Sequence, residues 1–148
     1  MSLLAQIQQE LKAAMLAKDV DRLATLRLLK SAIGYSQIEK KNENLPEAEL
    51  IAIVQKEIKK RRDSIEQFQA GGRPELAAKE TAEIQVLEQF LPKQLTGEEL
   101  ELLIRDVIRD FGATGKKDMG PVIKAVQAKA AGRADGKTIS GAVSRLLP

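Results

Sequence analysis

Apolar residues recur at intervals of three and four along most of this chain, which is the period of an amphipathic α-helix. The first stripe consists of Leu4, Ile7, Leu11 and Met15. Combined with the capping and helix-breaking residues, this spacing predicts seven helices. Their approximate ranges are 2–18, 20–41, 46–70, 74–91, 96–112, 118–132 and 138–147. Strong helix formers dominate and β-branched runs are nearly absent, so the predicted fold class is all-α and multihelical.

A proline-marked connection, Phe90–Leu95, separates the fourth predicted helix from the fifth. Pro92 is the best candidate for a boundary between domains, because proline cannot continue a helix. The pattern therefore predicts two helical subdomains, an N-terminal one of about four helices (1–91) and a C-terminal one of about three (92–148).

The second predicted helix is apolar on two sides. One stripe contains Leu26, Leu29 and Ile33, whereas Leu28 and Tyr35 lie largely opposite. A helix of this kind is usually central, so we expect neighbours on both faces.

Composition excludes several classes of function. The hydrophobic content is 43%, but aromatic residues make up only 3%, and there is neither histidine nor cysteine. Imidazole bases, activated thiols, thiolate metal sites and disulfides are therefore impossible, although carboxylate and lysine chemistry remain available. We expect no catalytic residue, no metal and no cofactor. The sequence shows no apolar run long enough to span a membrane and no secretory signal pattern, which predicts a cytoplasmic protein without membrane contact.

Charge is distributed unevenly between the predicted subdomains. Residues 1–91 carry 14 basic and 14 acidic side chains, so the whole net charge of +3 lies in residues 92–148. Within the latter, residues 92–112 have three basic and five acidic side chains, whereas residues 113–148 have seven basic and two acidic ones. A local excess of +5 with two glycine-bearing turns favours binding of a polyanion.

The loop Gly132–Lys137 and the segment around Asp118 are the candidate anion sites. Gly132 is expected to end the sixth helix in a left-handed conformation, and Thr138 to cap the seventh. Neither role requires Arg133 or Lys137, and cations beside exposed backbone amides suit a phosphate. Loop architecture alone explains the glycines equally well. The same basic region supplies the predicted RNA contacts, which are Lys116, Lys117, Lys124, Lys129, Arg133 and Lys137.

A secondary basic face lies on the third predicted helix, where Lys56, Lys59 and Lys60 share one side. These ammonium groups could follow phosphates, but an ordinary solvated face, partly neutralised by nearby acids, is the favoured interpretation. Arg61 falls on the apolar side instead. We expect its stem to pack there and its guanidinium to pair with a carboxylate.

Five short sequence segments, in this order along the chain, resemble the YqeY family: Gln55–Arg61, Ala70–Leu76, Phe90–Leu95, Asp118–Gly120 and Gly132–Lys137. The resemblance covers essentially the whole chain. It implies an all-helical protein whose motif is shared with the tail of the GatB subunit of glutamine-dependent transfer-RNA amidotransferases. In that enzyme the tail helps to hold the transfer RNA while other domains carry out the chemistry. The family is labelled by association with carbon–nitrogen ligases that use glutamine as amido-nitrogen donor.

The chain is similar to the tail alone, without a counterpart of the amidase catalytic region or an ATP-binding cradle. The leading hypothesis is therefore a non-catalytic module that binds transfer RNA or another structured RNA through the C-terminal subdomain. A rival hypothesis is a helical adaptor that docks on an amidotransferase or an aminoacyl-tRNA synthetase, suggested by the amphipathic fifth helix. A third is enzymatic participation in amide transfer, which predicts glutamine- and ATP-dependent turnover by the purified chain.

Overall fold

The computed structural model describes all 148 residues and contains helices but no strand, which confirms the all-α class. The chain divides into two compact units, residues 1–91 and residues 92–148. Each unit has a hydrophobic core of its own, built almost entirely from aliphatic side chains. No helix is both long and apolar enough to cross a membrane.

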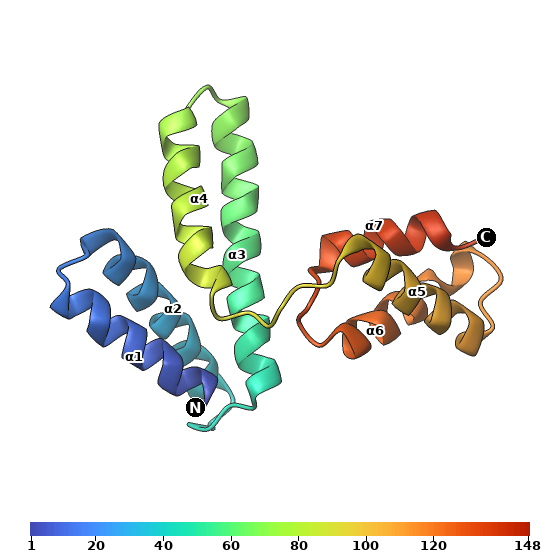
Figure 1. Cartoon of the computed structure of the whole chain (residues 1–148), viewed down its shortest axis with the longest axis horizontal. Coiled ribbons are helices and arrows are strands. Elements are labelled where there is room, and N and C mark those ends of the chain that lie inside the picture. The colour runs from blue at the N-terminus through green and yellow to red at the C-terminus, as the bar shows by residue number, and fades with distance from the viewer. The chain divides into compact units, whose positions relative to one another are not determined.

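The first unit consists of two helical hairpins (Figure 1). Its helices are α1 (Leu3–Leu16), α2 (Val20–Glu39), α3 (Glu47–Ala70) and α4 (Pro74–Glu88). The turn between α3 and α4 is tight because Gly72 adopts a left-handed conformation, with φ of 71°. Ile7, Leu26 and Leu87 are among the fully buried side chains that join the hairpins.

Helix α2 contacts α1, α3 and α4, as expected of a central helix, but these neighbours do not cover its second apolar stripe. Leu26, Leu29 and Ile33 are buried against the other helices of the first unit. On the opposite side, however, Leu28 and Tyr35 are exposed. The hydrophobic pattern was detected correctly, but nothing in the chain covers its second stripe.

The third helix carries the buried arginine that the sequence predicted. Nη1 of Arg61 donates to the carbonyl oxygen of Glu57 at 3.0 Å and lies 3.5 Å from Oε1 of the same residue. Nε of Arg61 lies 3.4 Å from Oε2 of Glu83 on α4. Burial, followed by the adjacent Glu83 carboxylate, raises the pKa of Glu80. Arg61 thus joins the two helices of the long hairpin in a cluster of carboxyl groups.

The second unit is a bundle of three helices with one short 3-10 turn. These elements are α5 (Gly97–Phe111), the 3-10 turn η1 (Lys116–Asp118), α6 (Met119–Ala130) and α7 (Gly136–Leu146). Ile104, Val122, Val126 and Val143 are completely buried in its centre. A capping box starts α5, where Thr96 and Glu99 exchange side-chain and backbone hydrogen bonds.

In the second unit, two predicted N-caps are wrong and one predicted helix end is confirmed in part. Asp118 stands at the start of α6, but its carboxylate accepts from the backbone N–H of Thr114 instead of capping the helix. Helix α6 ends at Ala130. Gly132 is left-handed as predicted (φ 84°), but the residue before it, Ala131, is left-handed as well (φ 49°). Helix α7 is capped by Asp135, whose Oδ1 accepts from the N–H of Thr138 at 2.7 Å. Asp135 therefore caps α7 in place of the predicted Thr138, and the helix begins at Gly136, two residues before the predicted start.

Candidate nucleic-acid interface

The predicted RNA contacts lie on three neighbouring parts of the second unit. Lys116 and Lys117 belong to η1, Lys124 and Lys129 to α6, and Lys137 to the first turn of α7. All five lysines are exposed. Buried Val122, Val126 and Ala130 fix which side of α6 faces the core. The fold therefore directs these lysines to the surface.

The lysines of α6 do not share one face. Lys124 and Lys129 are five residues apart, which separates them by about 140° around a helix. Neither they nor Lys117 form a hydrogen bond or ion pair within the chain. Their charge is thus available to a ligand, but it is spread over a curved surface and does not converge on a single pocket.

Lys116, one of the predicted RNA contacts, has a structural partner within the second unit. Its Nζ donates to the backbone carbonyl of Ser144 and lies 3.5 Å from the Ser144 hydroxyl oxygen. Ser144 is in the last turns of α7, where carbonyl oxygens lack partners within the helix. A cation at this end also interacts favourably with the helix dipole. Lys116 therefore fastens the loop before α6 to the end of α7.

Arg133 also serves the fold, although sequence reasoning found no structural need for it. Its Nε donates to the carbonyl oxygen of Lys93 at 2.9 Å, and its own carbonyl accepts from the N–H of Leu95 at 2.7 Å. Nη2 lies 3.8 Å from Oε2 of Glu99. Beside it, Nε2 of Gln94 donates to the carbonyl oxygen of Gly132 at 3.1 Å. The loop after α6 thus holds the segment that leads into α5, an interaction between residues about forty apart that no local motif could reveal.

The pKa of one carboxyl group beside this loop, that of Glu99, is lowered. Hydrogen bonds from Thr96 lower the pKa of Glu99, and the nearby Arg133 and Lys93 lower it further. Glu99 therefore remains ionised at neutral pH and partly neutralises Arg133. Lys137 lies in the first turn of α7, where its positive charge opposes the helix dipole.

The secondary basic face is also exposed, on α3 of the first unit. Lys60 forms an ion pair with Oε2 of Glu57 at 3.0 Å, whereas Lys56 and Lys59 have no partner in the chain. Partial neutralisation is what the interpretation as a solvated face predicted.

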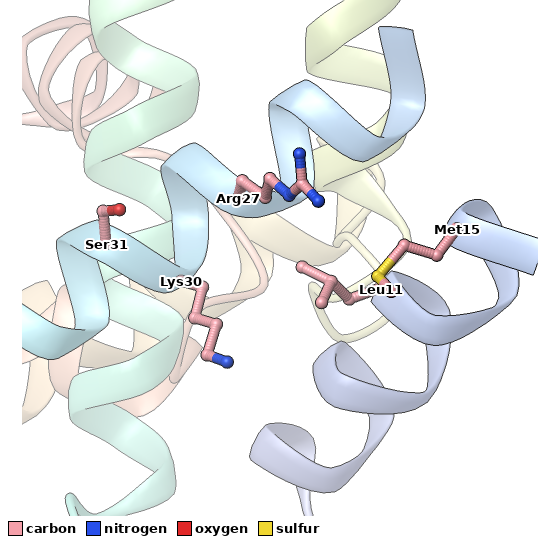
Figure 2. Close-up of a pocket in the computed structure, with 5 residues that line it drawn as sticks. All are labelled: Leu11, Met15, Arg27, Lys30 and Ser31. Carbon is pink, nitrogen blue, oxygen red and sulfur yellow. The ribbon is translucent and has the colours of Figure 1, made fainter. Parts of the chain in front are cut away.

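Other kinds of site are sparse. No group of three or more acidic residues is arranged to hold a metal ion. An open groove of about 480 Å³ lies between α1 and α2 in the first unit, lined by Leu11, Met15, Arg27, Lys30 and Ser31 (Figure 2). It contains no pair of carboxylates or other catalytic arrangement.

Comparison with known proteins identifies relatives of the whole chain. The model of the family described as Yqey-like protein matches residues 4–147. A Kluyveromyces lactis protein called altered inheritance of mitochondria protein 41, mitochondrial, is 35% identical over 141 residues, which are 93% of this chain and 72% of that protein.

Proteins of the same name from two other yeasts match a shorter region. The one from Lachancea thermotolerans is 35% identical over 66% of this chain, and the one from Saccharomyces cerevisiae (strain YJM789) is 32% identical over 65%. Each alignment covers 52% of the yeast protein. The chain thus spans about half the length of these two relatives.

Proposed function

The chain belongs to the YqeY family, and from that premise we propose that it binds structured RNA, in particular transfer RNA, through its C-terminal unit. The observation that carries the proposal is the charge of residues 113–148, where seven basic side chains meet only two acidic ones. Exposed lysines neutralise phosphates and release the counterions that surround them. The resemblance to the amidotransferase tail supports transfer RNA as the polyanion.

The expected mode of recognition is by shape and phosphate. Phe111 is the sole aromatic residue of the second unit, so the unit offers no platform on which successive bases could stack. Double-stranded RNA is generally recognised through its backbone and groove shape. A convex bundle with lysines on several sides suits this mode better than sequence-specific readout of unpaired bases.

The six predicted contacts divide into two groups in this proposal. Lys117, Lys124, Lys129 and Lys137 bind phosphates directly. Lys116 and Arg133 act mainly by positioning the loops that carry the others, because both bind backbone carbonyls within the unit. The secondary face of Lys56, Lys59 and Lys60 is a separate and weaker candidate.

Binding of fluorescently labelled transfer RNA, measured by anisotropy over a salt series, tests the proposal. Replacing Lys117, Lys124, Lys129 and Lys137 together with Ala should weaken binding and flatten the dependence of log K on log salt. The slope should fall by about 0.7 to 0.9 for each phosphate that the variant no longer neutralises. If replacing one of these residues weakens the binding of different transfer RNAs by the same factor, that residue contacts phosphate and does not read bases.

A matched variant removes the same number of charges from the first unit. Lys12, Lys56, Lys59 and Lys79 are all outside the core of that unit, and replacing them with Ala also tests the secondary basic face. The proposal predicts a much smaller effect than that of the C-terminal variant. Equal losses in the two variants, or no binding of transfer RNA by the unaltered protein at low salt, would overturn it.

A second candidate function is that of an adaptor for an amidotransferase or an aminoacyl-tRNA synthetase. Helix α5 favours it, since Leu102 and Phe111 are exposed on an otherwise strongly amphipathic helix. A purified partner that binds after nuclease treatment, and loses affinity when Leu102 is replaced with Glu, would support this function over direct RNA binding.

In this proposal the protein associates with glutamine-dependent amidotransferase systems but does not catalyse amide transfer by itself. The prediction for the purified protein is no release of ammonia from glutamine in the presence of ATP and transfer RNA. Turnover under these conditions would contradict the non-catalytic assignment.

The proposed compartment is the cytoplasm. The yeast relatives are named as mitochondrial proteins, which makes a mitochondrial location the alternative. Cell fractionation with an antibody to the chain distinguishes the two compartments.

A further inference from the structure

Exposed apolar side chains are concentrated on the first hairpin, which consists of α1 and α2. Most of the exposed large hydrophobic residues of the chain belong to these two helices, namely Met15, Leu16, Val20, Leu28, Tyr35 and Ile38. Single exposed apolar residues are ordinary, whereas a concentration of them marks a surface that binds something. The first hairpin is therefore the part of the chain in which to look for a docking site.

The groove between α1 and α2 gives this surface a defined shape (Figure 2). Leu11 and Met15 form its apolar floor from α1, and Arg27, Lys30 and Ser31 line it from α2. Its volume is about 480 Å³, and it is open to solvent. A small molecule would stay largely in contact with water there, whereas ligand pockets bury most of the ligand surface. An elongated occupant with a polar outer face of its own fits an open groove better.

The charged residues beside the groove are cations. Arg27 and Lys30 line it, and Lys12 lies three residues before Met15 on the same side of α1. All three cations are exposed, and none of them forms an ion pair within the chain. The groove thus combines an apolar floor with a basic rim.

The acidic residues of the first hairpin do not neutralise this rim. Oε2 of Glu10 lies 2.7 Å from Nη2 of Arg22, and the carboxylate of Asp19 accepts from the backbone N–H of Arg22 at the start of α2. Asp21 and Glu39 lie on a different side of α2 from the two cations that line the groove. The positive charge of the rim is therefore left for a partner to complement.

An acidic amphipathic helix matches both properties of the groove. RNA would bring phosphates but no apolar surface to cover Leu11 and Met15. An extended peptide would need backbone partners, which two helices do not offer because their own backbone groups are already paired. A helix pairs its backbone internally and can place carboxylates one turn apart against Arg27 and Lys30. Gly34, one turn after Lys30, carries no side chain that would obstruct such a helix.

We propose that the groove between α1 and α2 binds an acidic amphipathic helix of a partner protein. Apolar side chains of that helix contact Leu11 and Met15, and its carboxylates pair with Arg27, Lys30 and Lys12. The thioether of Met15 is flexible and adapts to apolar side chains of different shapes. This inference does not depend on RNA binding, which is assigned to lysines of the second unit.

Fluorescence anisotropy with two labelled synthetic peptides and the full chain tests the charge complementarity. Both peptides carry leucine at helical spacing, and their remaining positions are mainly glutamate in one and lysine in the other. We expect the glutamate peptide to bind at least about tenfold more tightly, and the double variant Arg27→Glu, Lys30→Glu to reverse this preference. The matched control, Lys56→Glu with Lys59→Glu, makes the same charge change on exposed lysines of α3 and should leave the preference unchanged.

Met15→Ser tests the apolar floor and should weaken binding of the glutamate peptide by about tenfold. Leu102→Ser is its control, because Leu102 is comparably exposed but lies on α5, and this variant should bind like the unaltered protein. Circular dichroism checks that all variants are folded. Equal binding of the two peptides, no binding of either, or equal effects of the groove and control variants overturns the proposal. Binding of phosphatidylserine vesicles that requires Arg27 and Lys30, without binding of the glutamate peptide, also overturns it and identifies a membrane contact.

Discussion

Replacing Arg61 with Met should destabilise the first unit strongly, although the substitution preserves most of the volume of the side chain. The Arg61 side chain is only 9% exposed and lies within 3.5 Å of carboxylate oxygens from Glu57 and Glu83. Removing one partner from a buried ion pair leaves the other charge uncompensated, which costs about 3–5 kcal/mol. Because Glu57 and Glu83 retain some exposure, we expect a loss of about 3 kcal/mol in the free energy of unfolding, at the lower end of that range.

Lys60 provides a matched control within the same cluster. Its ammonium group pairs with the same Glu57 at 3.0 Å, but its side chain is 61% exposed. Exposed ion pairs contribute about 0–1 kcal/mol, so Lys60→Met should cost less than about 1 kcal/mol. Urea denaturation followed by far-UV circular dichroism measures both variants, and hydrogen exchange assigns the loss to α3 and α4.

The loss caused by Arg61→Met should also depend on pH. The pKa of Glu80 is raised in the folded protein, and the Arg61 charge partly opposes that rise. A carboxyl group with a raised pKa favours folding below its unfolded pKa and loses that contribution as pH rises through the folded value. Without Arg61 the raised pKa rises further, so the deficit of Arg61→Met should be smaller in mild acid than at neutral pH. Equal destabilisation by Arg61→Met and Lys60→Met, or a deficit that grows in acid, would refute the electrostatic explanation.

Three further predictions concern the second unit. Ala131→Gly should stabilise it by about 1 kcal/mol, because a left-handed φ of 49° strains every residue with a Cβ atom; thermal unfolding measures the gain. Thr96→Ala should destabilise α5 by about 0.5–2 kcal/mol through loss of the capping box with Glu99, seen as faster hydrogen exchange in its first turn. A hydrogen bond from Arg145 lowers the pKa of Glu101, so this pair contributes stability that is lost as pH falls through the folded pKa; Arg145→Ala should move the NMR titration of Glu101 upward.

Helix positions followed from the sequence because the information that determines them is local. The Thr96–Glu99 capping box and the glycines at positions 71, 72 and 112 act within one turn of the residues that they affect. The role of Arg61 was predictable too, because a cation on an apolar face needs a nearby carboxylate.

The errors at helix ends arose where two capping residues competed. Asp135 and Thr138 both favour N-caps, and only three-dimensional geometry shows that the aspartate accepts while the threonine N–H donates. Asp118 had an alternative donor, the N–H of Thr114, that helix motifs alone do not reveal.

The structural roles of two candidate RNA contacts could not be derived from the sequence. Arg133 binds the carbonyl of Lys93, and Lys116 binds that of Ser144, which are 40 and 28 residues away. Such pairs depend on how three helices pack, and composition or spacing contains no signal for them. RNA contact by the remaining lysines stays a prediction.

The link between Arg133 and Lys93 has a practical consequence for dissection of the protein. Because residues just before α5 are bonded to the loop after α6, they belong to the folding unit even though they are not helical. A fragment that starts at Gly97 would lack the carbonyl to which Arg133 donates and the backbone N–H of Leu95. An autonomous C-terminal fragment should therefore begin at Pro92, and limited proteolysis should cut on the N-terminal side of that residue before it cuts anywhere up to Thr96.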